Sequence, residues 1–125
     1  MSVVKDYTER ARLFRALAHP ARLQILDILR RDEECVCHME AGLGRSQAYI
    51  SQQLMVLRDV GLVDTRKEGL NVFYRLADPT AIAPLLETAL GPVAGEGRHH
   101  PAGCPCPKCA RGSAGELPDT YCMSR

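Results

Sequence analysis

A glycine and a serine, two positions apart, divide two helical segments in the middle of this 125-residue chain. Gly44 suits the C-terminal stop of a short helix over about 35–43, and Ser46 suits the N-cap of the next helix. That second helix is expected to run to about Val60. Its buried stripe, spaced i, i+4 and i+7, consists of Ile50, Leu54 and Leu57. The segment is therefore restricted to two helices joined by a tight turn.

Apolar spacing predicts further helices on either side of this pair. One begins with a capping sequence at Asp6, and another restarts at His19-Pro20, since proline suits the first turn of a helix. A last helix is expected over about 79–90.

After the central pair the pattern changes from helical to extended. Residues 62–66 and 72–76 flank the polar segment 67–71, which is typical of a β-hairpin with a basic tip. The predicted fold class is mainly α with a small β-hairpin, in the order of a winged helix-turn-helix.

The last 35 residues differ in composition from the rest of the chain. Eleven of them are Gly or Pro, and large apolar side chains nearly vanish, so this segment cannot build a core of its own. We expect one domain over residues 1–91 and a flexible tail rich in Cys, Gly and Pro over residues 92–125.

The distribution of apolar residues also bears on location. No apolar run is long enough to cross a membrane, and the charged N-terminus lacks the apolar stretch of a signal peptide. We therefore expect a cytoplasmic protein with no membrane partner.

In a reducing compartment, cysteines are better explained as thiolate ligands or redox thiols than as disulfides. The six cysteines form two clusters and one isolated residue: Cys35 and Cys37; Cys104, Cys106 and Cys109; and Cys122.

The second helix of the central pair has the side chains expected of a DNA reader. Its outward face is polar with almost no charge, and the major groove of DNA admits one α-helix. Residues 1–90 hold 12 basic and 12 acidic side chains, so any DNA affinity depends on local placement of charge. Basic residues of the hairpin are expected to contact phosphates, which positions the protein without reading sequence. The predicted DNA-contacting residues are Arg45, Ser46, Gln47, Tyr49, Ser51, Gln52, Arg66, Lys67 and Arg75.

Four segments resemble the ArsR/SmtB family of metal-sensing repressors, in family order: LAHPARLQILDIL, ECVCHME, GRSQAYISQQLMVLRDVGLV and RKEGLNVFYRL. The resemblance covers about residues 10–77. It implies a homodimer that binds a palindromic operator in double-stranded DNA and releases it when metal binds. It also implies that the first and last helices form the dimer interface. The interface candidates are Phe14, Leu17, Leu85 and Leu86.

The cysteine pair Cys35 and Cys37 is the candidate start of a metal site. In a regular helix, residues i and i+2 point about 200° apart, so the two can share an ion only if the helix start is extended or frayed. ECVCH resembles the thiolate motif of the family's arsenite and cadmium/lead sensors. Arsenite-type members often carry a third cysteine where this chain has Glu40. We therefore expect Cys104, Cys106 or Cys109 to supply the missing thiolate.

Coordination geometry separates the candidate ions. Three thiolates suit As(III), Sb(III) and Pb(II), whereas four in a tetrahedron suit Cd(II) or Zn(II). We favour As(III) or Sb(III) as inducer, with Cd(II), Pb(II) or Zn(II) as alternatives. The roles of His99, His100 and Cys122 stay open.

Other classes of function compete with a metal-released repressor. Cys35 or Cys37 can instead oxidise with a tail cysteine in a redox-sensing repressor, or pack as a small core residue. The CxCxxC cluster alone would suit a metal carrier. We do not expect an enzyme, because no nucleophile–base pair, phosphate loop or catalytic carboxylate pair stands out.

Overall fold

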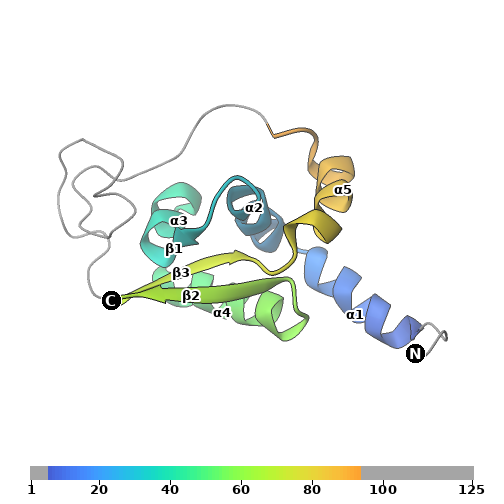
Figure 1. Cartoon of the computed structure of the whole chain (residues 1–125), viewed down its shortest axis with the longest axis horizontal. Coiled ribbons are helices and arrows are strands. Elements are labelled where there is room, and N and C mark those ends of the chain that lie inside the picture. The colour runs from blue at the N-terminus through green and yellow to red at the C-terminus, as the bar shows by residue number, and fades with distance from the viewer. Residues whose placement is uncertain (1–5, 94–125) are drawn as a thin grey trace.

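The structure, a computed structural model, describes residues 6–93. Figure 1 shows α-helices around a small antiparallel sheet, with helices α1 and α5 at the opposite end of the molecule from the hairpin tip. In chain order the elements are α1 (Tyr7–Leu17), α2 (Pro20–Leu29), β1 (Glu34–Cys35), α3 (Val36–Leu43), α4 (Gln47–Asp59), β2 (Val63–Glu68), β3 (Asn71–Leu76) and α5 (Pro79–Leu90). The predicted fold class, mainly α with a small hairpin, is confirmed. Residues 94–125, nearly all of the predicted tail, lie outside the described residues.

Side-chain caps fix where the helices begin. Asp6 accepts hydrogen bonds from the backbone amides of Thr8 and Glu9 at 3.0 and 3.3 Å. Ser46 accepts one from the amide of Tyr49 at 3.2 Å, as its position before α4 predicts. Gly44 ends α3 with a φ of 67°, a left-handed conformation that costs glycine little. The tight turn between α3 and α4 is therefore specified locally.

The sheet has three strands in the order β1-β3-β2, all antiparallel. Strand β1 was not predicted: it is a two-residue strand just before α3, in which Glu34 pairs with Tyr74 and Cys35 with Phe73. The hairpin is also longer than predicted, since β2 and β3 continue to a final pair formed by Glu68 and Asn71. Only Gly69 and Leu70 remain for the turn in place of the five residues expected.

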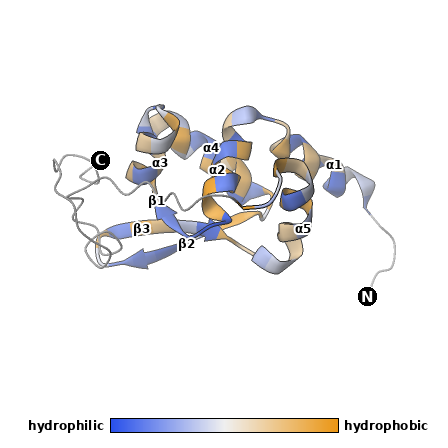
Figure 2. Ribbon diagram, turned by 90° about the horizontal axis from the view of Figure 1, so that it is seen from above, coloured by the Kyte–Doolittle hydropathy of each residue, from blue (hydrophilic) through white to orange (hydrophobic). Residues whose placement is uncertain are grey.

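The core lies between the helices and the sheet. Figure 2 shows apolar residues along the helices that surround it, α2 among them. The largest fully buried side chains include Phe73 of β3 and Met39 of α3. The predicted stripe of α4 is buried, with Ile50, Leu54 and Leu57 at most 1% exposed. This packing holds α4 rigidly from behind while its other face stays open to solvent.

Candidate nucleic-acid interface and thiol site

Helix α4, which we call the reading helix because it is predicted to contact DNA bases, carries the predicted base-contacting side chains near its N-terminus. Gln52 is exposed, whereas Gln47, Tyr49 and Ser51 are half-buried. The guanidinium of Arg45 lies over the Tyr49 ring at 4.0 Å, so these two predicted DNA contacts are held together by a cation–π interaction. Ser46 is exposed but its hydroxyl caps the helix, which gives it a structural role beside the predicted one.

Gln53 ties this helix to the rest of the protein. Its Oε1 atom accepts a hydrogen bond of 2.8 Å from Nη1 of Arg22 in α2. The Nε atom of the same arginine donates to the carbonyl of Ala16 at 2.6 Å, near the C-terminal end of α1. A single guanidinium therefore joins the ends of α1 and α2 to the reading helix, a link that the sequence pattern did not indicate.

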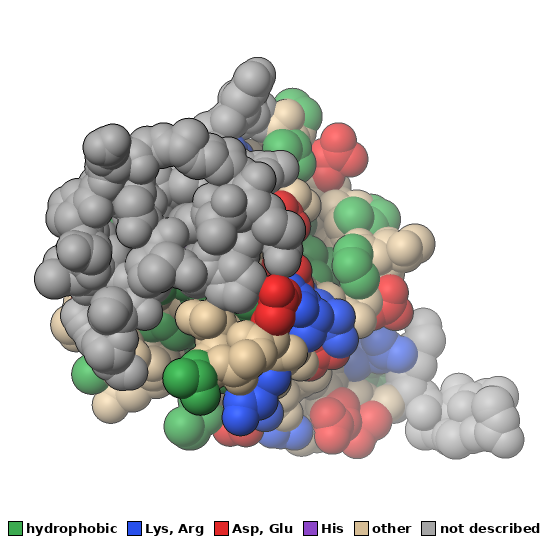
Figure 3. Space-filling model, turned by 60° about the vertical axis from the view of Figure 1, so that its left-hand side comes forward, with side chains coloured by type: hydrophobic (Ala, Val, Ile, Leu, Met, Phe, Trp, Pro, Cys, Tyr) green, Lys and Arg blue, Asp and Glu red, His purple; other side chains and the backbone are tan. Residues whose placement is uncertain are grey.

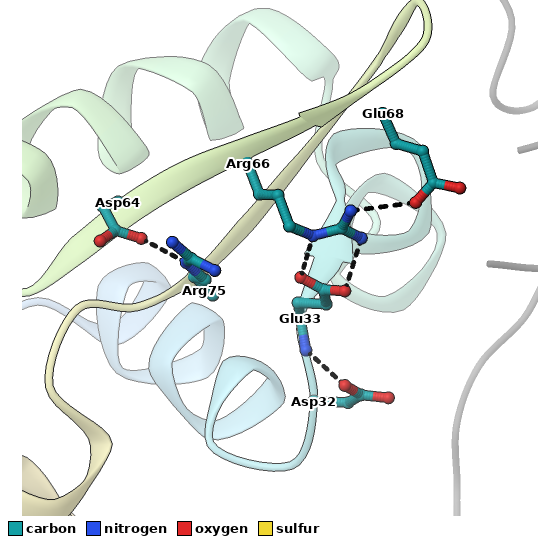
Figure 4. A network of polar contacts seen from close by, with 6 residues as sticks. All are labelled: Asp32, Glu33, Asp64, Arg66, Glu68 and Arg75. Atoms are coloured by element: carbon teal, nitrogen blue, oxygen red, sulfur yellow. Dashed lines mark hydrogen bonds and ion pairs between the residues drawn. The ribbon is translucent and has the colours of Figure 1, made fainter. Parts of the chain in front are cut away.

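The predicted phosphate-binding arginines of the hairpin are engaged within the protein. Arg66 binds Glu33 and Glu68, and Arg75 donates to Asp64 at 2.8 Å, as Figure 4 shows. Hydrogen bonds to Glu33 and then Glu68 raise the pKa of Arg66 further above its ordinary value. Lys67, between Arg66 and Glu68 on β2, is exposed. Contact of Arg66 and Arg75 with DNA therefore stays a prediction that requires these ion pairs to exchange.

The face that carries the hairpin end is mixed in charge rather than uniformly basic. In Figure 3, Lys and Arg side chains lie directly beside Asp and Glu side chains on this face. This agrees with the near balance of charge over the domain, and it indicates a moderate dependence of DNA affinity on salt.

Cys35 and Cys37 lie at the junction of β1 and α3. Cys35 is the last residue of β1 and the N-cap of α3, with extended backbone angles of −92° and 165°. The Sγ atoms of the two cysteines are 2.7 Å apart. The helix start is thus extended at Cys35, which is the arrangement that the sequence required for two thiolates to share one ion. Two thiolates on a tetrahedral ion with bonds of about 2.3 Å lie roughly 3.8 Å apart, so the pair needs only a small opening to accept one.

A buried Glu–His pair flanks the cysteines. The Nδ1 atom of His38 lies 2.6 Å from the Oε1 atom of Glu34, and the two residues are 3% and 5% exposed. Sequence reasoning gave no role to Glu34 and left His38 as a residue that lines the helix. The helical i, i+4 rule gives no signal for this contact, because Glu34 lies in β1 and only His38 lies in α3.

The described part of the chain does not complete a metal site. Within residues 6–93, no group of three or more His, Cys, Asp or Glu side chains is placed to hold a metal ion. Cys104, Cys106, Cys109 and Cys122 lie outside the described residues, as do His99 and His100. The prediction that a further cysteine joins Cys35 and Cys37 therefore stays a prediction.

The four predicted dimer-interface residues differ in the surface they offer. Phe14 is 55% exposed and Leu85 is half-buried. Leu17 and Leu86 are 8% and 1% exposed because they pack into the core of the single chain. Phe14 and Leu85 therefore have surface that a second copy of the chain could contact. Leu17 and Leu86 have almost none.

Among the described residues, no helix is long and apolar enough to cross a membrane.

Comparison with known proteins places this geometry in a group of regulators. Residues 19–65 match the sequence pattern of the family described as bacterial regulatory protein, arsR family. The chain is 49% identical over 83 residues to the biofilm growth-associated repressor of Agrobacterium fabrum, covering 66% of this chain and 70% of that protein. It is 44% identical over 70 residues to a transcriptional repressor SmtB homolog of Synechocystis, of which it spans 53%.

A solved structure has the same fold. It is the solution structure of a homodimeric winged helix-turn-helix DNA-binding domain from Mycobacterium bovis, a possible ArsR-family regulator. The TM-score is 0.63 at 33% identity, with 71% of this chain and 86% of that chain covered.

Proposed function

Because this chain belongs to the ArsR family of bacterial regulatory proteins, we propose that it is a repressor that As(III) or Sb(III) releases from operator DNA. Its relatives regulate transcription, which agrees with the prediction that the chain is not an enzyme. The proposal has two parts: a winged helix-turn-helix dimer that binds DNA, and a thiolate site that controls it.

The DNA-binding part rests on α4 and the hairpin. Gln47, Ser51 and Gln52 place amide and hydroxyl groups where base edges of a major groove would lie, and such groups discriminate bases by hydrogen bonding. Lys67 is exposed on β2, where a phosphate contact would position the dimer without reading sequence. Two copies joined through α1 and α5 would present two α4 helices to a palindromic site.

The observation that carries the inducer proposal is the 2.7 Å distance between the sulfur atoms of Cys35 and Cys37. When both sulfurs are reduced and have lost their protons, one thiophilic ion can bind the two together. We assign the third thiolate to Cys104, Cys106 or Cys109, because Glu40 offers a carboxylate that is a poor partner for As(III). Recruitment of a fourth thiolate would instead favour Cd(II) or Zn(II), and three would also suit Pb(II).

The position of the thiol site explains how a bound ion would release DNA. Cys35 caps α3, the helix that packs behind the reading helix, so an ion that reorients Cys35 strains the helix pair. Coupling between two such sites is typically about 1–3 kcal/mol and is reciprocal, so operator DNA must also weaken ion binding.

A titration with a panel of ions tests this function. The reduced full-length protein is bound to a labelled operator fragment, and arsenite, antimonite, cadmium, lead and zinc are added in turn. We expect arsenite and antimonite to release DNA at the lowest concentrations. A full-length variant with Cys104, Cys106 and Cys109 all changed to Ser should lose this response while keeping its DNA affinity. Equal release of that variant by arsenite would overturn the assignment of the third ligand.

A thiol redox sensor, in which Cys35 or Cys37 oxidises with a tail cysteine, is the second candidate. It is favoured by Cys37, which is disulfide-bonded in the structure, whereas Cys35 is a thiol. Two thiols and one hydrogen peroxide would give one disulfide and two waters, with the sulfurs oxidised and the peroxide reduced. Release by peroxide in the absence of metal, with no release by arsenite under reducing conditions, would favour this candidate.

A further inference from the structure

The ion pair between Glu33 and Arg66 connects the cysteine segment to the hairpin. We propose that this bridge couples the thiol site to the wing, which we define as β2, β3 and their turn (63–76), so that the wing shifts when an ion binds. The inference rests on the function proposed above and adds a route by which the bound ion acts on the DNA-contacting surface.

Backbone pairing provides the first connection. Cys35 of β1 pairs with Phe73 of β3, and Phe73 pairs with Arg66 of β2, so the three residues lie in one row across the sheet. Phe73, the middle residue of the row, is fully buried at 0% exposure. Because close-packed interiors transmit strain rather than absorb it, a displacement of Cys35 reaches β2 through this row.

Side chains provide a second connection over the same span. Glu33, two residues before Cys35, accepts hydrogen bonds from Nε and Nη2 of Arg66 at 3.0 and 2.7 Å. The side chains of Arg66 and Glu33 are only 30% and 24% exposed, and the guanidinium lies over the Phe73 ring at 4.8 Å. Two parallel hydrogen bonds fix the orientation of the guanidinium relative to the carboxylate as well as the distance between them. Strand β1 and the residue before it are thus bound to the wing both by backbone pairing and by a side-chain ion pair.

The other ion pair of the wing provides a contrast. Arg75 and Asp64 are neighbours in the register of β3 and β2, each side chain is 49% exposed, and their contact does not involve β1. Figure 4 shows the two pairs at different places on the hairpin, with Glu33 reaching Arg66 from outside the hairpin. Arg75–Asp64 is therefore a matched control: an Arg–carboxylate contact on the same sheet with no link to the thiol site.

The expected consequence concerns Lys67, the residue after Arg66 on β2. Lys67 is exposed, so tilting the wing changes its distance from a DNA phosphate even if α4 does not move. Removing the bridge should therefore leave ion binding in place and reduce its effect on DNA.

The test compares DNA affinity with and without arsenite for reduced full-length wild type, Glu33→Gln and Asp64→Asn. The measured quantity is the factor by which arsenite weakens binding to one operator fragment. We expect this factor to fall by about 2-fold to 30-fold in Glu33→Gln and to stay at the wild-type value in Asp64→Asn. Arsenite stoichiometry, measured separately, should be the same in all three proteins. An unchanged factor in Glu33→Gln overturns the coupling role while leaving the proposed function intact, whereas a wild type that arsenite never releases contradicts both.

Hydrogen exchange on the wild type provides a measurement that does not depend on the folding of a variant. Arsenite should change the protection of amides in β2 and β3 as well as in α3. Changes confined to α3 and α4, with the wing unaltered, would contradict the proposal.

Discussion

Glu34 and His38 form a contact of 2.6 Å between two buried side chains, one before and one after Cys35 and Cys37 in the chain. The contact therefore joins β1 to α3 across the cysteine pair. Removing one side of such a contact costs more than removing both, because the polar group that stays buried loses this hydrogen bond.

Removal of either partner of the Glu34–His38 pair should therefore destabilise the fold. We expect Glu34→Leu or His38→Leu to lower the free energy of unfolding by about 1–3 kcal/mol each, and the double variant to lose less than the sum. Urea denaturation of the four proteins measures the interaction. Strict additivity of the two single effects would show that the contact contributes nothing of its own.

The reading helix and the wing should respond differently to substitution. Gln52→Ala should change the order of preference among operator variants by about 1–3 kcal/mol at one base position, because an exposed amide can read a base edge. Its control is Lys67→Ala, which should weaken binding to all sequences alike and reduce the slope of log affinity against log salt by about 1. Binding measurements on a set of operator variants at several salt concentrations separate the two effects. A uniform loss with Gln52→Ala would remove that residue from the reading surface.

Introducing a charge at Phe14 should break the proposed dimer. It is 55% exposed in the single chain, so Phe14→Glu can fold, and a carboxylate in an apolar interface is strongly disfavoured. We expect dimerisation weakened by about 30-fold or more, as for a residue central to an interface. Leu70→Glu, on the 99% exposed turn of the wing, serves as the control that keeps the dimer. Sedimentation equilibrium measures both, and an unchanged dimer in Phe14→Glu would place the interface elsewhere.

Local patterns in the sequence predicted the helices well. The apolar spacing and the caps placed α4 within about one residue of its bounds, because Ser46 and Ile50 act over a single turn. The extended start of α3 at Cys35 also followed from local chemistry, since two thiolates at i and i+2 cannot meet on a regular helix.

Features that depend on distant pairing were not predictable in this way. Strand β1 has two residues and exists only because Glu34 and Cys35 meet Tyr74 and Phe73 far along the chain. The Glu33–Arg66 bridge joins residues 33 positions apart. Arg66, which was predicted to contact a DNA phosphate, binds a carboxylate of the same chain instead. Leu86 was expected to be buried and also to contact a partner, and packing within the single chain leaves it only 1% exposed.

The most direct test of the central claim is the release of DNA by arsenite in full-length wild type and in the Cys35→Ser and Cys37→Ser variants, all reduced. Both variants should bind the operator with wild-type affinity, since neither sulfur belongs to the reading surface. Arsenite should release the wild type from DNA and leave both variants bound. Release of either variant at wild-type arsenite concentrations would contradict the central claim.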